Sequence, residues 1–155
     1  MIISENKIIS KSVMSEDQKY RYSLTKEWNP DKKKAAVIML NPSKANSLKL
    51  DITIMRLTNY FVDNDYGGFE VVNLFAFMSS TPKELKNRDT AFEAQNDAFI
   101  IESAKCYEKI IIAWGSDNNK YVSRKREVIQ LLQPYKEKLF AFVDEKGKKQ
   151  GIRGT

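Results

Sequence analysis

The sequence predicts an α/β fold, a three-layer α/β/α sandwich around a mainly parallel four-stranded central sheet, with a β hairpin at its N-terminal end. Four short, continuous apolar runs cross the 155-residue chain, and amphipathic stretches of helical length separate them. Strands buried on both faces have such continuous apolar sequences, and their alternation with helices indicates parallel neighbours. The length suits a single α/β domain, which we place at residues 1–155.

The first thirty residues predict the hairpin. Residues 19–24 alternate polar and apolar side chains, as a half-buried strand does. Asn29-Pro30-Asp31 has the composition of a turn. We expect residues 2–13 to supply the second strand of the hairpin.

The four apolar runs predict the strands of the central sheet. They lie at residues 35–40, 69–76, 110–114 and 139–143. We expect each of these strands to be buried on both faces, with right-handed crossovers between them.

The stretches between the runs predict helices. Residues 52–64 carry apolar side chains at helical spacing, and Asp51 is placed to cap that helix. Thr81-Pro82-Lys83-Glu84 has the pattern of a capping box, and residues 90–107 and 119–133 are further amphipathic stretches. The apolar face expected for the helix at 90–107 consists of Ala91, Ala94, Ala98 and Ile101.

The composition excludes several kinds of site. The chain has no histidine and one cysteine, Cys106, so it contains neither a Ser-His-Asp triad, nor a Cys-His pair, nor a cysteine-based zinc site. We therefore expect no metal and no cofactor. No apolar run approaches the roughly 18 residues needed to span a bilayer, and no signal peptide is recognisable. We expect a cytoplasmic protein without membrane contact.

The net charge of +6 is unevenly distributed along the chain. Residues 31–56 carry six basic and two acidic side chains, and residues 119–155 carry ten basic and four acidic ones. The segment between them, residues 57–118, has a charge of −5, from five basic and ten acidic side chains. Two basic stretches could present a positive face to a phosphate-bearing partner. The alternative is that these lysines and arginines only decorate the surface.

The ends of the predicted strands carry the residues with the most chemistry. Ligands of open parallel sheets bind beyond the carboxyl ends of the strands, so we expect the loops after these strands to line one site. They offer amides, hydroxyls, a lysine and aromatic rings. The candidate ligand-binding residues are Asn41, Pro42, Ser43, Lys44, Thr53, Arg56, Asn73, Phe75, Phe77, Trp114, Gly115 and Ser116.

Each candidate also has a purely structural interpretation. Asn41 with Pro42 can simply end a strand, and Asn73 can tie two loops together. The aromatic residues Phe75, Phe77 and Trp114 can belong to the core.

Other conspicuous residues have similar alternatives. Asp51 can be only a helix cap, and Gly115 can only relieve a tight turn. Asn96-Asp97 and the cluster at residues 124–126 fit exposed helix faces. Cys106 fits an inert buried thiol, because no base flanks it in the sequence.

Six segments together resemble the domain-of-unknown-function family 1643 of bacteria and phages. They are Tyr20-Arg21-Tyr22-Ser23-Leu24 with Trp28, residues 39–45 (MLNPSKA), residues 51–56 (DITIMR), residues 72–76 (VNLFA), Asn96-Asp97 and Ala113-Trp114-Gly115. The resemblance extends from about residue 20 to about residue 145 and implies no activity by itself.

The order of these segments is more distantly similar to the uracil-DNA glycosylase superfamily. That resemblance implies that Asn41 would position an attacking water and that Phe75 or Phe77 would stack on the base. The superfamily pattern ends with a His-Pro element, whereas this chain ends in residues 147–155 (GKKQGIRGT) without one. This difference counts against catalysis more than against the fold or a pocket.

Three functions follow as hypotheses. The first is a pocket that binds a nucleotide or nucleotide-derived signal molecule without catalysis. The second is an N-glycosidase acting on a base in DNA or on a nucleoside. Its catalytic residues would be Asn41 and Asp51, and Ser43 or Lys44 would stabilise the anion of the leaving base. The third is a nonspecific nucleic-acid-binding module, whose affinity would fall steeply with salt. The expected partner is a nucleotide-like small molecule or nucleic acid, and a homo-oligomer is possible.

Overall fold

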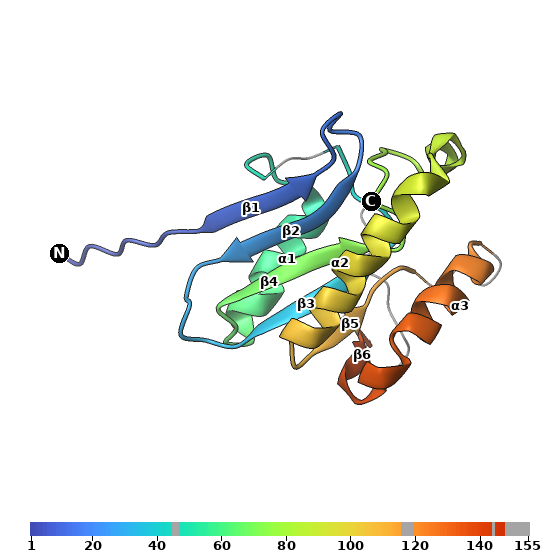
Figure 1. Ribbon diagram of the computed structural model, residues 1–155. Helices are drawn as coiled ribbons and strands as arrows, with labels where there is room; N and C mark the ends of the chain where they lie inside the picture. The colour runs from blue at the N-terminus through green and yellow to red at the C-terminus, as the bar shows by residue number, and fades with distance from the viewer. Residues whose placement is uncertain (45–46, 116–119, 144, 148–155) are drawn as a thin grey trace.

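The four apolar runs and two N-terminal strands form one mixed sheet of six strands, in the order β1-β2-β4-β3-β5-β6 (Figure 1). The computed structural model describes residues 1–44, 47–115, 120–143 and 145–147. Antiparallel pairing joins β1 to β2 and β2 to β4, whereas the pairs β3–β4, β3–β5 and β5–β6 are parallel. The strands are β1 (Ile9–Met14), β2 (Arg21–Glu27), β3 (Lys34–Met39), β4 (Gly68–Asn73), β5 (Ile110–Ile112) and β6 (Leu139–Ala141).

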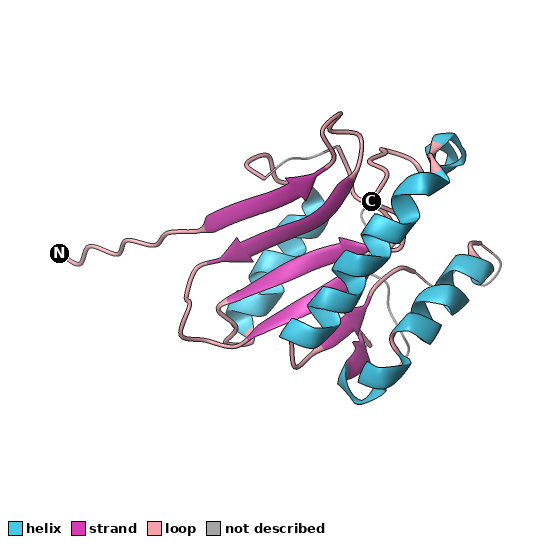
Figure 2. Cartoon of the chain, viewed as in Figure 1, coloured by secondary structure: helices cyan, strands magenta, loops and turns pink. Residues whose placement is uncertain are grey.

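Helices cover both faces of this sheet (Figure 2). The described residues form the α-helices α1 (Ile52–Asp63), α2 (Glu93–Cys106) and α3 (Val122–Leu131). They also form the 3-10 helices η1 (Pro82–Asn87), η2 (Thr90–Phe92) and η3 (Gln133–Lys138). Within the described segments, no helix is long and apolar enough to cross a membrane.

Alternate side chains of the strands enter two separate cores. Val37 and Val71 pack against Leu57 of α1 on one face. Ile38 and Val72 pack against α2 and α3 on the other face. This division follows from the two-residue period of a strand and gives α1 one side of the sheet and α2 with α3 the other.

The predicted α/β class is confirmed, with one sheet of six strands in place of a four-stranded sheet and a separate hairpin. The hairpin strand begins at Ile9 rather than residue 2. Strand β6 is not buried on both faces, because it lies at the edge of the sheet and exposes Phe140 and Ala141. The segment after Thr81 is the 3-10 helix η1, and the Thr81 side chain makes no capping hydrogen bond. The predicted capping box is therefore wrong.

The predicted buried face of α2 is also wrong. Ala91, Ala94 and Ala98 are exposed. The buried residues of α2 are Asn96, Ile100, Ser103 and Ala104. A pattern of apolar residues could not locate this face, because two of its four members are polar and are buried by virtue of their hydrogen bonds.

A β-bulge in the hairpin determines where Arg21 points. Val13 pairs with Ser23 and Met14 with Arg21, so Tyr22 is an extra residue in β2. Tyr22 and Ser23 both face α2: the Tyr22 ring stacks on Phe99, and the Ser23 hydroxyl donates to Glu70. The side chain of the preceding residue, Arg21, therefore points to the α1 face. Re-aiming a side chain in this way is a recurrent use of bulges beside functional sites.

Candidate functional site

The carboxyl ends of β3, β4 and β5 meet at one edge of the sheet, which we call the carboxyl edge. Beyond β4, the Leu74 amide donates to the Met39 carbonyl at 2.8 Å, and the Phe75 amide donates to Leu40 at 3.0 Å. On the other side of β3, the Ala113 amide donates to Ile38 at 2.8 Å. The segments that carry Asn41, Asn73 and Trp114 therefore emerge side by side.

Asn41 holds two of these segments together. Its Nδ2 donates to the Ser79 hydroxyl at 2.7 Å and to the Pro42 carbonyl at 3.2 Å. The Ser79 amide in turn donates to Pro42 at 3.1 Å. Pro42 and Ser79 are buried, and Asn41 is half-buried. The amide nitrogen of Asn41 is thus occupied in joining the loop after β3 to the loop after β4.

Asp51 and Ser43 close the loop between β3 and α1. The Ser43 hydroxyl donates to Oδ2 of Asp51. The other oxygen, Oδ1, accepts the Ile54 amide at 2.7 Å, so Asp51 is the N-cap of α1 as predicted. Both carboxylate oxygens of Asp51 are therefore engaged within the protein.

Two buried cations lie on the α1 face beside this loop, and neither is among the ligand-binding residues predicted from the sequence. Arg21 is 3% exposed and Lys26 is 4% exposed. Lys26 follows Leu24 by two residues and shares its face of the sheet, and its Nζ donates to the Ser47 carbonyl at 2.7 Å. The Ser10 hydroxyl donates to the same carbonyl. The alternation in β2 predicts that its polar side chains face water, so it offered no signal for their burial.

The electrostatics links these cations to each other and to Asp51. Burial lowers the pKa of Arg21, and the nearby Asp51 carboxylate raises it by a smaller amount. Burial, and then the positive charge of Arg21, lower the pKa of Lys26. Among the described residues, no carboxylate lies within ion-pair distance of Lys26 Nζ.

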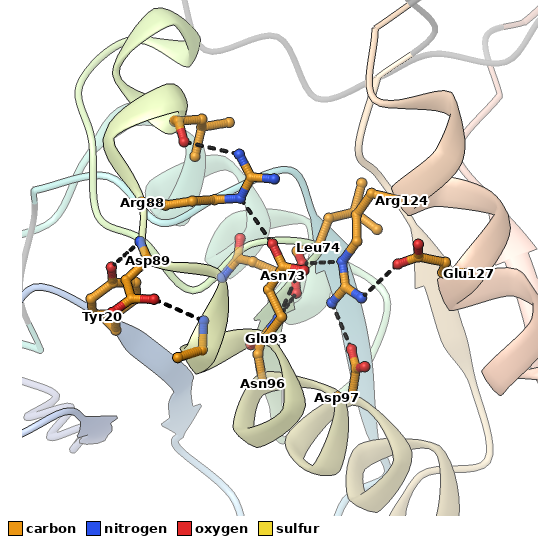
Figure 3. A network of polar contacts seen from close by, with 12 residues as sticks. Tyr20, Asn73, Leu74, Arg88, Asp89, Glu93, Asn96, Asp97, Arg124 and Glu127 are labelled. Atoms are coloured by element: carbon orange, nitrogen blue, oxygen red, sulfur yellow. Dashed lines mark hydrogen bonds and ion pairs between the residues drawn. The ribbon is translucent and has the colours of Figure 1, made fainter.

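On the opposite face, the carbonyl oxygen of Leu74 is the centre of a polar network (Figure 3). Arg124 of α3 donates to it from Nε at 2.9 Å, and Asn96 of α2 donates from Nδ2 at 3.1 Å. Asn96 also donates to the Asn73 carbonyl at 2.8 Å. Arg124 pairs in addition with Asp97, at 2.6 Å. Arg124 is 6% exposed and Asn96 is 1% exposed, so the alternative that placed them on exposed helix faces is wrong for both.

Asn73 lies at the end of β4 and is buried. The network engages its backbone carbonyl, whereas its side-chain Oδ1 has no hydrogen-bond partner within the described part of the chain. The same holds there for the Oδ1 of Asn96. Two buried amide oxygens beside the carboxyl edge thus retain the capacity to accept a hydrogen bond.

The candidate aromatic residues differ in accessibility. Phe75 is 2% exposed, with the Arg88 guanidinium 4.5 Å from its ring centre and Tyr121 edge-on at 5.2 Å. Its structural role as a core residue is confirmed. Phe77 and Trp114 are half-buried and pack against the α2–α3 core.

A small hollow opens beside Phe77. Its volume is about 10 Å³, roughly the space of one water molecule. It lies between the segment after β4 and the segment before α2. The residues that line it are Tyr20, Phe75, Ala76, Phe77, Arg88, Asp89, Phe92 and Glu93.

The remaining candidates surround the carboxyl edge or fall outside the described residues. Thr53 is half-buried and Arg56 is exposed in the first turns of α1, and exposed Lys44 lies 4.0 Å from Glu84. Gly115 has a φ of 89°, a left-handed conformation that favours glycine. Ser116 lies outside the described residues. In the segments that are described, no three carboxylate or cysteine side chains are grouped to hold a metal.

These features define an α/β protein whose strand ends carry amide, hydroxyl and buried cationic groups on one edge of a mixed sheet. The chain belongs to the family described as protein of unknown function (DUF1643), which matches residues 21–151. The resemblance to the domain-of-unknown-function family 1643 is thereby confirmed. No curated protein and no solved structure matches the chain.

Removing Arg124 should destabilise the fold. Arg124→Met leaves the Leu74 carbonyl with one donor fewer and Asp97 without its cationic partner. We expect the free energy of unfolding, measured in urea, to fall by about 2 kcal/mol. Arg126→Met, which removes an exposed charge from the same helix, should change stability by no more than about 0.5 kcal/mol. Equal effects of the two substitutions would contradict this account of the network.

The two functions of Asp51 can be separated by substitution. Asp51→Ala removes the cap of α1 and should lower stability by about 1 kcal/mol. Asp51→Asn keeps a capping oxygen, so thermal unfolding should show a smaller loss that reflects only the missing charge beside Arg21. An asparagine variant as unstable as the alanine variant would show that charge, not capping, dominates.

The burial of Lys26 predicts a specific pH dependence. A lysine whose pKa is lower in the folded than in the unfolded state opposes folding while it is charged, and this opposition vanishes near its ordinary value of 10.5. The stability of Lys26→Met relative to the wild type should therefore decline as the pH rises from 7 towards 10.5. Urea unfolding at several pH values measures this difference, with the exposed Lys86→Met as the control for losing one positive charge. A relative stability that increases with pH would contradict the prediction.

Proposed function

We propose that the protein binds a nucleotide or nucleotide-derived molecule at the carboxyl edge and sequesters it without chemical change. The observation that carries the proposal is the meeting of three kinds of group at that edge. Half-buried Phe77 and Trp114 offer ring surface for a base, the oxygen of Asn73 is an acceptor, and the loop before α1 lies beside two cations. Aromatic stacking and positive charge together suit a base joined to a phosphate.

The contacts of Asn41 and Asp51 favour binding over catalysis. In the glycosidase hypothesis, these residues would orient a water molecule. The Asn41 amide nitrogen instead donates to Ser79, and both oxygens of Asp51 accept hydrogen bonds from Ser43 and Ile54. Binding without catalysis requires no side chain that is free to orient a water molecule, so these contacts are compatible with binding.

We also propose that the fold is of the uracil-DNA glycosylase kind. The support is the order of segments along the chain: β3, then Asn41-Pro42, then α1, then β4 ending at Asn73-Leu74. A glycosylase-like sheet would place a base-binding pocket at this same edge. The proposal concerns architecture, and the binding proposal does not depend on it.

A panel of nucleosides and nucleotides tests the proposed function through thermal unfolding. A true ligand at about 100 times its Kd should stabilise the protein by about 2.7 kcal/mol, which corresponds to a rise in Tm of about 5 °C or more. Trp114→Ala should reduce this rise, whereas Phe140→Ala on the edge strand β6 should not.

Three outcomes would contradict this proposal. They are the absence of a Tm rise with every nucleotide, the release of free base from a damaged duplex, and binding that is lost as salt rises regardless of sequence. The second outcome would support the glycosidase, and the third would support the nonspecific nucleic-acid binder.

A further inference from the structure

The strongest unexplained feature of the molecule is a pair of buried cations beside the loop before α1. Arg21 and Lys26 are each more than nine-tenths buried. Burying a charge is costly unless an opposite charge or a full set of hydrogen bonds compensates it. Strand β2 could have placed apolar side chains at these positions, as it does with Leu24 on the same face.

The charge of Lys26 is not balanced by an ion pair among the described residues. Asp51 acts on Arg21, and its own oxygens also serve Ser43 and the cap of α1. The ammonium of Lys26 donates to one neutral acceptor, the Ser47 carbonyl. A buried ammonium whose described contacts include no carboxylate is suited to an anion that arrives from outside.

Ser47 provides a means for Lys26 to exchange partners. Its carbonyl accepts hydrogen bonds from both Lys26 and the Ser10 hydroxyl. If the Lys26 ammonium turns to an oxygen of a ligand, the Ser47 carbonyl therefore still accepts the hydrogen bond of Ser10. Ser47 is half-buried, so the acceptor of Lys26 lies close to the protein surface. The long, flexible stem of lysine allows this change without movement of β2.

We propose that Arg21 and Lys26 form the subsite that holds the phosphate group of the ligand, on the α1 face of β2 beside the loop that contains Ser47. This inference deepens the proposed function and rests on it for the ligand's base. Lys26 gives the phosphate a direct ammonium hydrogen bond. Arg21, which the bulge of β2 turns to this face, supplies a second positive charge that no change of pH near neutrality removes.

A structural interpretation of Lys26 makes the opposite prediction about stability. If Lys26 served only to pin Ser47, Lys26→Met would destabilise the free protein. If Lys26 is retained for an anion, the same substitution should leave the free protein equally or more stable and should weaken its response to phosphate. The pair of measurements separates the two roles.

The experiment compares the wild type, Lys26→Met and Lys138→Met in thermal unfolding with pyrophosphate, the four nucleoside 5′-monophosphates and the four nucleosides. Lys138 is the matched control, because its Nζ also donates to a backbone carbonyl, that of Ala104, at 2.9 Å. Lys138→Met should bind like the wild type. Lys26→Met should bind the monophosphates about ten- to hundredfold more weakly and should bind the nucleosides unchanged.

The outcomes distinguish this inference from the proposed function. Monophosphates that stabilise Lys26→Met and the wild type equally would overturn the phosphate subsite and leave nucleotide binding intact. Stabilisation of the wild type by pyrophosphate but by no nucleotide, lost in Lys26→Met, would support the subsite and refute the nucleotide. A Lys26→Met protein that is destabilised and still responds to phosphate would establish the structural role instead.

Discussion

The position of the carboxyl edge depends on the carbonyl oxygen of Leu74, the first residue beyond β4. Asn96 of α2 and Arg124 of α3 both donate to this oxygen, and each is buried in doing so. One backbone atom therefore connects the sheet to the two helices of one face and directs the chain after β4. From there the chain reaches Ser79, where Asn41 ties it to the loop after β3. A hydrogen-bonded framework of this kind holds an edge in place without covering it.

The two faces of the sheet make different contributions. On the α2–α3 face, the buried Arg124 has a partner, Asp97, and its role is to fix the backbone. On the α1 face, the buried Lys26 donates to a carbonyl and forms no ion pair among the described residues, although it lies close to Arg21. Asp97 balances the charge of Arg124, whereas no described carboxylate pairs with Lys26. This contrast leads us to place the phosphate on the α1 side of the edge.

The sequence predicted the positions of the strands and helices better than it predicted which of their faces are buried. Continuous apolar runs located β3, β4, β5 and β6, and Asp51 located the start of α1, because burial on both faces and helix capping leave local signatures. The buried face of α2 was not predictable, because Asn96 is buried for its hydrogen bonds rather than for apolarity. Arg21 was not predictable either, because its direction depends on a bulge in the pairing with β1. Residues whose role is set by distant partners leave no periodic pattern in the sequence.

The most direct test of the central claim is a map of amide chemical shifts during titration with a nucleoside monophosphate. The account predicts that shifts concentrate at the carboxyl edge, at Ser43 and Ser47 beside the phosphate and at Phe77 and Trp114 beside the base. Shifts that concentrate instead around Lys109 and Lys138, which precede β5 and β6, would contradict it, as would a spectrum that does not change.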